Sequence, residues 1–310
     1  MQITTESISP NVAEEIEFWN FVAHRQKIFA GRTWYPHEPH LNPEALEILK
    51  TYRFTNVYRM CDRHSRYIIA VMENPTFTTY AQLIEHILIF RYFNKIETYG
   101  IVCEVLNDQY SFIGKLTDLR NQNKNLFASF YHPKHKTGTT ITEVLTEQVM
   151  TLFGLLGIVE NLEHILTELD TDNWSQIFYN LLVNTGCTPR QAYQIMLDLI
   201  IPLDRINGQT LSRRTEFTGI SYASKQAIDA LEIMGIKGPW RTINRAIKAL
   251  TASQVTHLEK RNFPWINTIR GERILLSVHD IEHSLSQYWK FKHICNGGRG
   301  TLYVPYKKEA

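Results

Sequence analysis

Apolar residues recur at helical spacing along most of the chain. In residues 12–30 they form a broad stripe that follows the polar segment 9–11, which suits a helix N-cap. The stripe comprises Val12, Ile16, Trp19, Phe21, Val22 and Phe29. In residues 78–97 the same spacing indicates a buried helix. Similar patterns predict helices over 44–52, 141–157, 160–169, 173–185, 189–200, 221–234, 239–250, 254–262 and 279–292. The chain is therefore expected to be mainly α.

Two segments depart from this periodicity. Residues 31–43 hold three prolines among aromatic residues and histidines, which predicts an ordered loop. Residues 126–131 form a short apolar run, which predicts either a strand or a loop packed on the core. No period of about 20 to 50 residues repeats, which argues against a solenoid. We expect one helical catalytic domain over 1–310, which could divide into lobes 1–140 and 141–310.

Composition narrows the class of protein. Hydrophobic residues make up 44% and charged residues 21%, as in a globular protein, and the net charge of +2 neither requires nor excludes nucleic acid. The four cysteines form no C-x-x-C pair, which argues against a zinc ribbon or clustered iron–sulfur ligands. The sequence has no signal-peptide pattern and no apolar run of about 18 residues. We expect a cytoplasmic protein with no membrane partner, no metal and no cofactor.

Charged and aromatic side chains are concentrated in the segment FTNVYRMCDRHSRY, residues 54–67. On a helix, Tyr58 and Asp62 would lie four residues apart, as would Arg59 and Arg63, so cations and a carboxylate could share one ridge. Such a ridge could hold an anion. The alternative is an exposed helix with ordinary charge pairs.

A second candidate is the segment NTGCTPRQAYQIMLDL, residues 184–199. Gly186 suits a turn, Thr188 a helix cap and Pro189 the first helical position, so two helices joined by a hairpin are predicted. Backbone amides at Gly186 and Thr188, with the Arg190 side chain, could hold a DNA phosphate. The alternative is a plain helix–turn–helix connection.

The C-terminal stretch SVHDIEHSL allows three interpretations. Ser277 and Asp280 have the spacing of a capping box. His279 and His283 resemble the histidines of a metal-binding H-E-x-x-H helix, but an aspartate stands where the base would be and no third ligand is evident. In the functional interpretation, Asp280 or Glu282 is a carboxylate aimed into a nucleotide pocket.

Three blocks carry a resemblance to a known family. They are represented by Phe18, Trp19, Phe21 and Arg25; by Phe54, Asn56, Tyr58, Arg59, Asp62 and Arg63; and by Asp280, Glu282, His283, Leu285, Lys290 and Phe291. Their order resembles the α-glutamyl/putrescinyl-thymine pyrophosphorylases, a family that includes the helical domain joined to hydroxymethyluracil DNA kinases. The hairpin is similar to its family counterpart at Ala192, Tyr193, Gln194, Asp198 and Leu199. The hairpin lacks the second glycine of the family's hairpin. In the C-terminal block, Ser286 and Gln287 stand where the family has Cys-Glu.

The resemblance implies a helix-hairpin-helix, DNA-glycosylase-like bundle of two packed helical lobes. It implies a monofunctional DNA glycosylase that flips out and excises a hypermodified pyrimidine, such as glucosylated hydroxymethylcytosine, from phage DNA. An abasic site would remain, and phage replication would be limited. The partner would be double-stranded DNA with modified bases, and no obligate protein partner is inferred. A fixed carboxylate would stabilise the positive charge that develops on the sugar.

Each candidate residue receives a role from this resemblance. Asp280 is the first candidate for the catalytic carboxylate, Asp62 the second and Glu282 the third. Substrate contacts are expected from Asn56, Tyr58, Arg59, Arg63, Arg25, Tyr193, Gln194 and His283. Contacts to the DNA backbone are expected from Gly186, Thr188, Arg190, Lys290 and Arg299.

Two other functions stay open. One is a transferase that uses an amino acid or amine to displace pyrophosphate from an activated hydroxymethyl pyrimidine in DNA. The other is a non-catalytic reader of modified DNA. The sequence has no G-x-x-x-x-G-K-[ST] motif, so the kinase module that some relatives carry is not expected.

Overall fold

A computed structural model of the chain describes residues 11–31, 56–72, 79–93, 114, 118, 141–167, 173–207, 221, 223–268 and 270–298. The chain forms two compact units. Met1–Cys61 and Ser221–Ala310 make up the first unit, and Asp62–Ile220 makes up the second. These units do not coincide with lobes 1–140 and 141–310, because the N-terminal helix packs with helices near the C-terminus.

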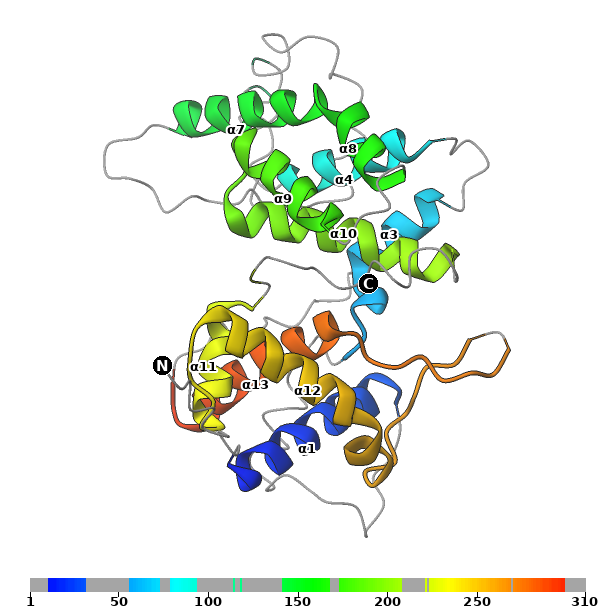
Figure 1. Cartoon of the computed structure of the whole chain (residues 1–310), viewed down its shortest axis with the longest axis vertical. Coiled ribbons are helices and arrows are strands. Elements are labelled where there is room, and N and C mark those ends of the chain that lie inside the picture. The colour runs from blue at the N-terminus through cyan, green and yellow to red at the C-terminus, as the bar shows by residue number, and fades with distance from the viewer. Residues whose placement is uncertain are drawn as a thin grey trace, which may run out of the picture. The chain divides into compact units, whose positions relative to one another are not determined.

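The first unit is built around one central helix. Helix α13 packs against α1, α11 and α12, and α12 also contacts α1 (Figure 1). The short 3-10 helix η1 belongs to the same unit. The helices are α1 Val12–Phe29, η1 Arg59–Cys61, α11 Lys225–Ile233, α12 Trp240–Glu259 and α13 Val278–Cys295.

Side-chain caps define three of these helix starts. The Asn11 side chain accepts from the Ala13 amide at 3.2 Å, which confirms the cap expected at 9–11. Ser224 caps α11 in the same way, so that helix begins at Lys225, later than expected. Ser277 caps α13 through a capping box with Asp280, as predicted.

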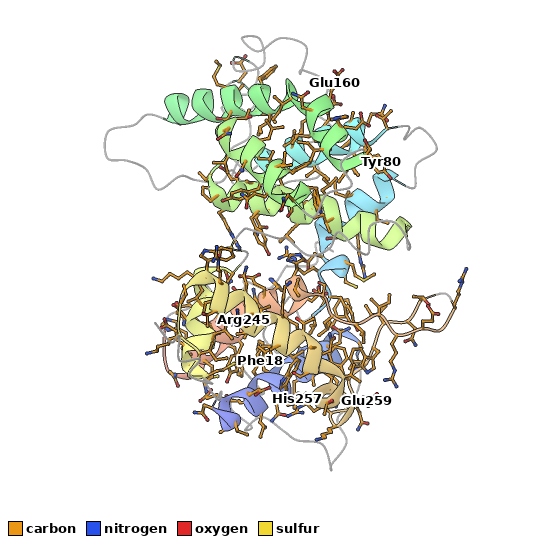
Figure 2. The ribbon with its side chains drawn as sticks, viewed as in Figure 1. Phe18, Tyr80, Glu160, Arg245, His257 and Glu259 are labelled. Atoms are coloured by element: carbon orange, nitrogen blue, oxygen red, sulfur yellow. The ribbon has the colours of Figure 1, made fainter. Side chains whose placement is uncertain are left out.

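An aromatic core joins α1 to α13. Phe21 and Phe291 have ring centroids 4.9 Å apart, and Phe18 meets Tyr288 edge-on at 5.6 Å. Figure 2 shows the Phe18 side chain inside this unit. Such aromatic pairs contribute more than their buried area alone. The FW-x-F block is therefore part of the packed core.

The apolar stripe predicted for α1 is wrong at both ends of the helix. Val12 is 64% exposed and Phe29 is 40% exposed. Residues 18–27 are instead buried on every face, including the polar residues 24–27. A helix surrounded by the rest of its unit buries all its faces, so a one-sided stripe does not describe it.

Residues 239–250 and 254–262, predicted as two helices, form the single helix α12. The predicted break was at the small polar residues 251–253. There, the Thr251 hydroxyl donates to the Ile247 carbonyl at 2.9 Å and the Ser253 hydroxyl to the Leu250 carbonyl at 3.1 Å. Because these hydroxyls are satisfied by their own helix, they do not end it.

The second unit is also helical. Helix α4 packs against α3, α7, α8 and α10, while α10 also contacts α3 and α9. The helices predicted over 78–97, 141–157, 160–169, 173–185 and 189–200 are confirmed, with α10 continuing through Pro202. The bounds are α3 Arg63–Met72, α4 Tyr80–Phe93, α7 Ile141–Leu156, α8 Val159–Thr167, α9 Trp174–Asn184 and α10 Pro189–Asn207.

The mainly α class is confirmed. Among the described residues, the one β pairing is the isolated antiparallel bridge between Asn267 and Arg273. The predictions for 31–43, 44–52 and 126–131 fall on residues outside the described part of the chain, apart from Gly31. In the described part, no single helix has the length and apolarity to cross a membrane. One pair bent by 50°, Val149–Leu156 with Val159–Thr167, meets those two criteria when taken together.

Candidate functional site

The segment at residues 56–61 adopts a different conformation from the helix considered for it. Residues 56–58 are non-helical, η1 covers Arg59–Cys61, and α3 begins only at Arg63. The Asn56 side-chain amide donates to the Tyr58 carbonyl at 2.9 Å. Local bonds of this kind compete with helix formation. Tyr58 and Asp62 therefore do not share a helical ridge, and that interpretation is wrong.

Helix α1 holds the start of this segment. The Arg25 guanidinium donates to the Asn56 carbonyl at 3.1 Å, and the Val57 amide donates to the Gln26 side-chain oxygen at 2.9 Å. The Arg25 guanidinium carbon also lies 5.3 Å from the centre of the Phe21 ring. Because Arg25 is fully buried, its cation makes these contacts in a poorly solvated environment.

Asp280 fixes the other end of the segment. The Arg59 amide donates to its Oδ1 at 2.7 Å. Its Oδ2 accepts from the Ser277 amide and the Ser277 hydroxyl, both at 2.8 Å. The Asp280 amide donates back to the Ser277 hydroxyl at 3.2 Å. The carboxylate thus caps α13 and ties segment 56–59 to it.

The electrostatics of Asp280 are set by burial. Removal from water raises the pKa of its carboxyl above the ordinary value of 3.8. Its hydrogen bonds from Arg59 and Ser277 and the charge of Arg59 oppose that shift, but they do not cancel it. A buried carboxyl group with a raised pKa beside an arginine is an arrangement often found at functional sites.

Tyr58 connects the same segment to a hairpin between α12 and α13. Its hydroxyl donates to the Ile274 carbonyl at 2.8 Å and accepts from the Ile266 amide at 3.4 Å. The Ile274 amide also donates to the Ile266 carbonyl at 2.8 Å. Figure 1 shows this hairpin, in orange, extending away from the helices of its unit. Burial raises the pKa of Tyr58, so the phenol stays protonated and can donate.

Glu282 makes a separate connection. Its Oε1 accepts from the amide of Ser224, the N-cap residue of α11, at 2.8 Å. Glu282 and His279 are buried, and His283 is half-buried. In the described part of the chain, no group of three or more His, Cys, Asp or Glu residues is arranged to hold a metal ion.

The hydrogen bonds bring together five of the predicted site residues from three distant blocks. These are Arg25, Asn56, Tyr58, Arg59 and Asp280, which we call the α13 cluster. Lys290 and His283 also lie on α13 and are half-buried. The Arg63 side chain and the whole of Arg299 lie outside the described part of the structure. The other predicted residues belong to the second unit: Asp62, Gly186, Thr188, Arg190, Tyr193 and Gln194.

In the second unit, the A-Y-Q-x-x-x-D element packs against a buried arginine. The Arg91 guanidinium on α4 donates to the Gln194 carbonyl and side-chain oxygen, both at 3.2 Å, and forms an ion pair with Asp198. All three residues are buried. Sequence reasoning missed Arg91, although a lone arginine within an apolar helix is a signal, since a buried cation requires a buried acceptor.

The predicted hairpin before α10 is confirmed as a structure. Gly186 has a φ of +105°, and a Cβ there would lie 3.2 Å from a methyl carbon of Thr151. The Thr188 amide donates to the Gln191 side-chain oxygen at 2.9 Å, and the Gln191 amide donates to the Thr188 hydroxyl at 3.3 Å. The Thr188 amide therefore already has a partner in its own helix.

Two other predicted residues lie beside this hairpin or at the boundary of the unit. Arg190 is exposed, with its guanidinium carbon 5.7 Å from the centre of the buried Tyr193 ring. Asp62 is half-buried and precedes α3. Their roles in substrate or DNA contact remain predictions.

Comparison with known proteins gives one family. The family model described as "5-hmdU DNA kinase, helical domain" matches residues 14–298. No match was found among curated proteins or among solved structures. The matched range includes all three sequence blocks, the whole α13 cluster and the hairpin before α10.

Proposed function

Because the chain belongs to the family of the 5-hmdU DNA kinase helical domain, we propose that it processes modified pyrimidines in DNA and is a DNA glycosylase. The proposed reaction is excision of a hypermodified pyrimidine, such as glucosylated hydroxymethylcytosine, from double-stranded phage DNA. The observation that supports it most is the buried Asp280 carboxyl in the cluster where the three blocks meet.

In this reaction, the bond between the base nitrogen and C1′ of the deoxyribose breaks. The base leaves with the electron pair and takes up a proton, and water adds to C1′ and loses a proton. Positive charge develops on the sugar in the transition state, so a nearby carboxylate lowers the barrier. Asp280 is the carboxylate we assign to this step, acting as an anion.

The contacts of Asp280 are compatible with this role. A carboxylate has about four acceptor positions, and three donors already occupy Asp280. Among the described residues, no second donor reaches Oδ1, so we assign that position to a water molecule or a substrate group. The three existing bonds hold the carboxylate in one orientation, which is what preorganised stabilisation of a transition state requires.

We assign Asn56 and Tyr58 a positioning role and no direct contact with the substrate. Their side-chain polar groups contact backbone atoms, so we assign them to positioning Arg59 and Asp280 instead of reading the base edge. Arg59 and His283 are the neighbours that we assign to contacts with the flipped nucleotide. Asp62 and Glu282 stay as alternative carboxylates.

The direct test is an abasic-site assay. Purified protein is incubated with DNA from a phage that carries glucosylated cytosine and with unmodified DNA, and abasic sites and released base are measured. We expect abasic sites only in the modified DNA. Absence of abasic sites on every phage-type modified DNA would exclude a glycosylase.

Ser277→Ala provides a matched control for Asp280→Asn. Both substitutions break the capping box, but Ser277→Ala keeps the carboxylate. If Asp280 is catalytic, Asp280→Asn abolishes excision while Ser277→Ala retains it in proportion to the folded fraction. Equal effects of the two substitutions, matched by equal losses of stability, would mean that Asp280 only caps α13.

A second candidate is the transferase that attaches an amine to the base, because the matched family is that of a 5-hmdU DNA kinase, an enzyme that modifies a base and keeps it. In that reaction, an amine attacks the methylene carbon of a pyrophosphorylated hydroxymethyl pyrimidine. The carbon–oxygen bond breaks, pyrophosphate leaves with the electron pair, and the amine loses a proton. The nucleoside exchanges its pyrophosphate group for the amine substituent and no abasic site forms, so mass spectrometry of digested DNA separates the two activities.

A further inference from the structure

The first unit carries an exposed basic face that lies outside the α13 cluster. On α12, Arg241, Arg245 and Lys248 are exposed and follow one another at four and three residues, so they share one side of the helix. Lys237, in the turn before α12, is also exposed. We call these four residues the α12 basic face. Arg245 is labelled on α12 in Figure 2.

The opposite side of α12 is buried against its unit. Ile243, Ile247, Leu250 and Leu258 point into the core. The orientation of α12 is therefore set by apolar packing, and the cations are held outward by the helix period. Charge interactions of exposed lysine and arginine side chains usually add little to stability.

The sequence of α12 supplies almost no compensating charge. No carboxylate occurs in this helix before its last residue, Glu259, and that carboxylate pairs with Arg273. Residues 225–248 contain five cations, and only two carboxylates, Asp229 and Glu232 on α11. A chain with a formal charge of only +2 thus concentrates positive charge on one helix.

An exposed aromatic residue lies at the start of the same helix. Trp240 is 39% exposed, and the Arg241 guanidinium carbon lies 5.4 Å from the centre of its ring. A tryptophan and an arginine that stack in the open form a surface suited to sugars and bases next to phosphates. The positive end of the α12 dipole lies at the same place and adds to the potential there.

From these features we propose that the α12 basic face binds the phosphate backbone of double-stranded DNA. Seven residues of helix separate Arg241 from Lys248, which is about 10 Å along its axis. One strand of DNA carries a charge about every 3.4 Å of its axis, so this length corresponds to about three phosphates. The binding is independent of base identity, because phosphates carry no sequence information.

This inference rests on the proposed function only in taking DNA as the partner. The face is distinct from Asp280, so backbone binding and base excision can be separated by substitution. It also assigns a role to the segment KGPWR, which sequence alone does not distinguish from solvated charge.

The test is the salt dependence of binding to an unmodified DNA duplex. The triple variant Arg241→Gln, Arg245→Gln and Lys248→Gln is compared with the wild-type chain. The control is Arg66→Gln, Lys260→Gln and Arg270→Gln, which removes the same net charge from other exposed positions. Circular dichroism and thermal unfolding check that both variants remain folded.

We expect the slope of log affinity against log salt to become shallower by about 0.9 for each lost phosphate contact, so by about 2.7 in the first variant. The control is expected to keep the wild-type slope. Equal slopes in the two variants would overturn the proposal. Binding to vesicles of anionic lipid that depends on the α12 basic face, with no binding to DNA, would overturn it in favour of a membrane surface.

The outcome can be distinguished from failure of the glycosylase proposal. If no DNA yields abasic sites but the α12 substitutions still weaken duplex binding, the excision proposal fails and this inference stands. If excision occurs but the α12 substitutions leave duplex binding unchanged, the excision proposal stands and this inference fails.

Discussion

At the level of single residues, Asp280 combines two tasks that make opposite demands on its charge. Asp280 caps α13 and links it to Arg59 by accepting three hydrogen bonds, which favour the anion. As a buried group, it has a raised pKa, which favours the neutral acid. The balance between these effects can be measured through the pH dependence of stability.

The first prediction concerns this pH dependence. Between the ordinary aspartate pKa of 3.8 and the raised value, the folded state binds more protons than the unfolded state, so the free energy of unfolding falls as pH rises. Urea unfolding of the wild-type chain and Asp280→Asn is measured between about pH 4 and pH 8. The stability difference, wild type minus variant, is expected to decrease with pH.

The catalytic role predicts the opposite trend for activity. Excision requires the anion, so its rate should rise over the same pH range in which stability falls. A stability difference that grows with pH would show that the hydrogen bonds outweigh burial and that the pKa of Asp280 lies below its ordinary value.

A second prediction at this scale concerns Tyr58. Tyr58→Phe removes the donor to Ile274 and the acceptor for the Ile266 amide, so the free energy of unfolding should fall by about 1–2 kcal/mol. The Ile266 amide should also exchange its proton faster, as measured by hydrogen exchange. Tyr288→Phe, which removes a hydroxyl bonded to Glu14, is the matched control. It should leave exchange at Ile266 unchanged.

At the level of elements, most described helices are predictable from apolar spacing and caps, because both depend on residues a few positions apart. Thr188 and Ser277 show this for α10 and α13. Segment 56–61 shows the limit. Its conformation depends on Gln26, Arg25 and Asp280, which are distant in sequence, and local charge spacing alone favours a helix there.

The link between α4 and α10 provides a prediction at this scale. Asp198→Asn leaves the buried Arg91 cation without its charge partner and should destabilise the chain by about 3–5 kcal/mol. The double variant Arg91→Met and Asp198→Leu removes both charges and should recover much of that loss. Denaturant unfolding of this double variant and of its two component variants, Arg91→Met and Asp198→Leu, measures the coupling. Additive losses would mean that the ion pair contributes no interaction of its own.

At the level of the whole molecule, the candidate site depends on contacts that no local pattern contains. The three blocks indicate by resemblance that distant residues belong together, but they do not show how. The structure shows that Arg25, Asn56, Tyr58, Arg59 and Asp280 meet mainly through backbone atoms. The sequence therefore identifies the members of the α13 cluster, whereas their hydrogen-bond roles require the fold.

The division of the chain leads to a last prediction. The second unit, Asp62–Ile220, is one continuous segment with its own buried residues, including Leu83, Leu152, Phe178 and Met196. Expressed alone, it should therefore fold into a helical protein that unfolds cooperatively, as followed by far-ultraviolet circular dichroism on heating. It should lack excision activity, since Asp280 belongs to the other unit.

Asp198→Asn supplies the control for native packing in this fragment. If the fragment keeps the contact between α4 and α10, this substitution should lower its stability by about as much as in the full chain, since Arg91 and Asp198 both lie within it. A fragment that is helical but insensitive to Asp198→Asn would have lost that packing. Its core would then depend on the rest of the chain, and the continuous segment would not be an independent folding unit.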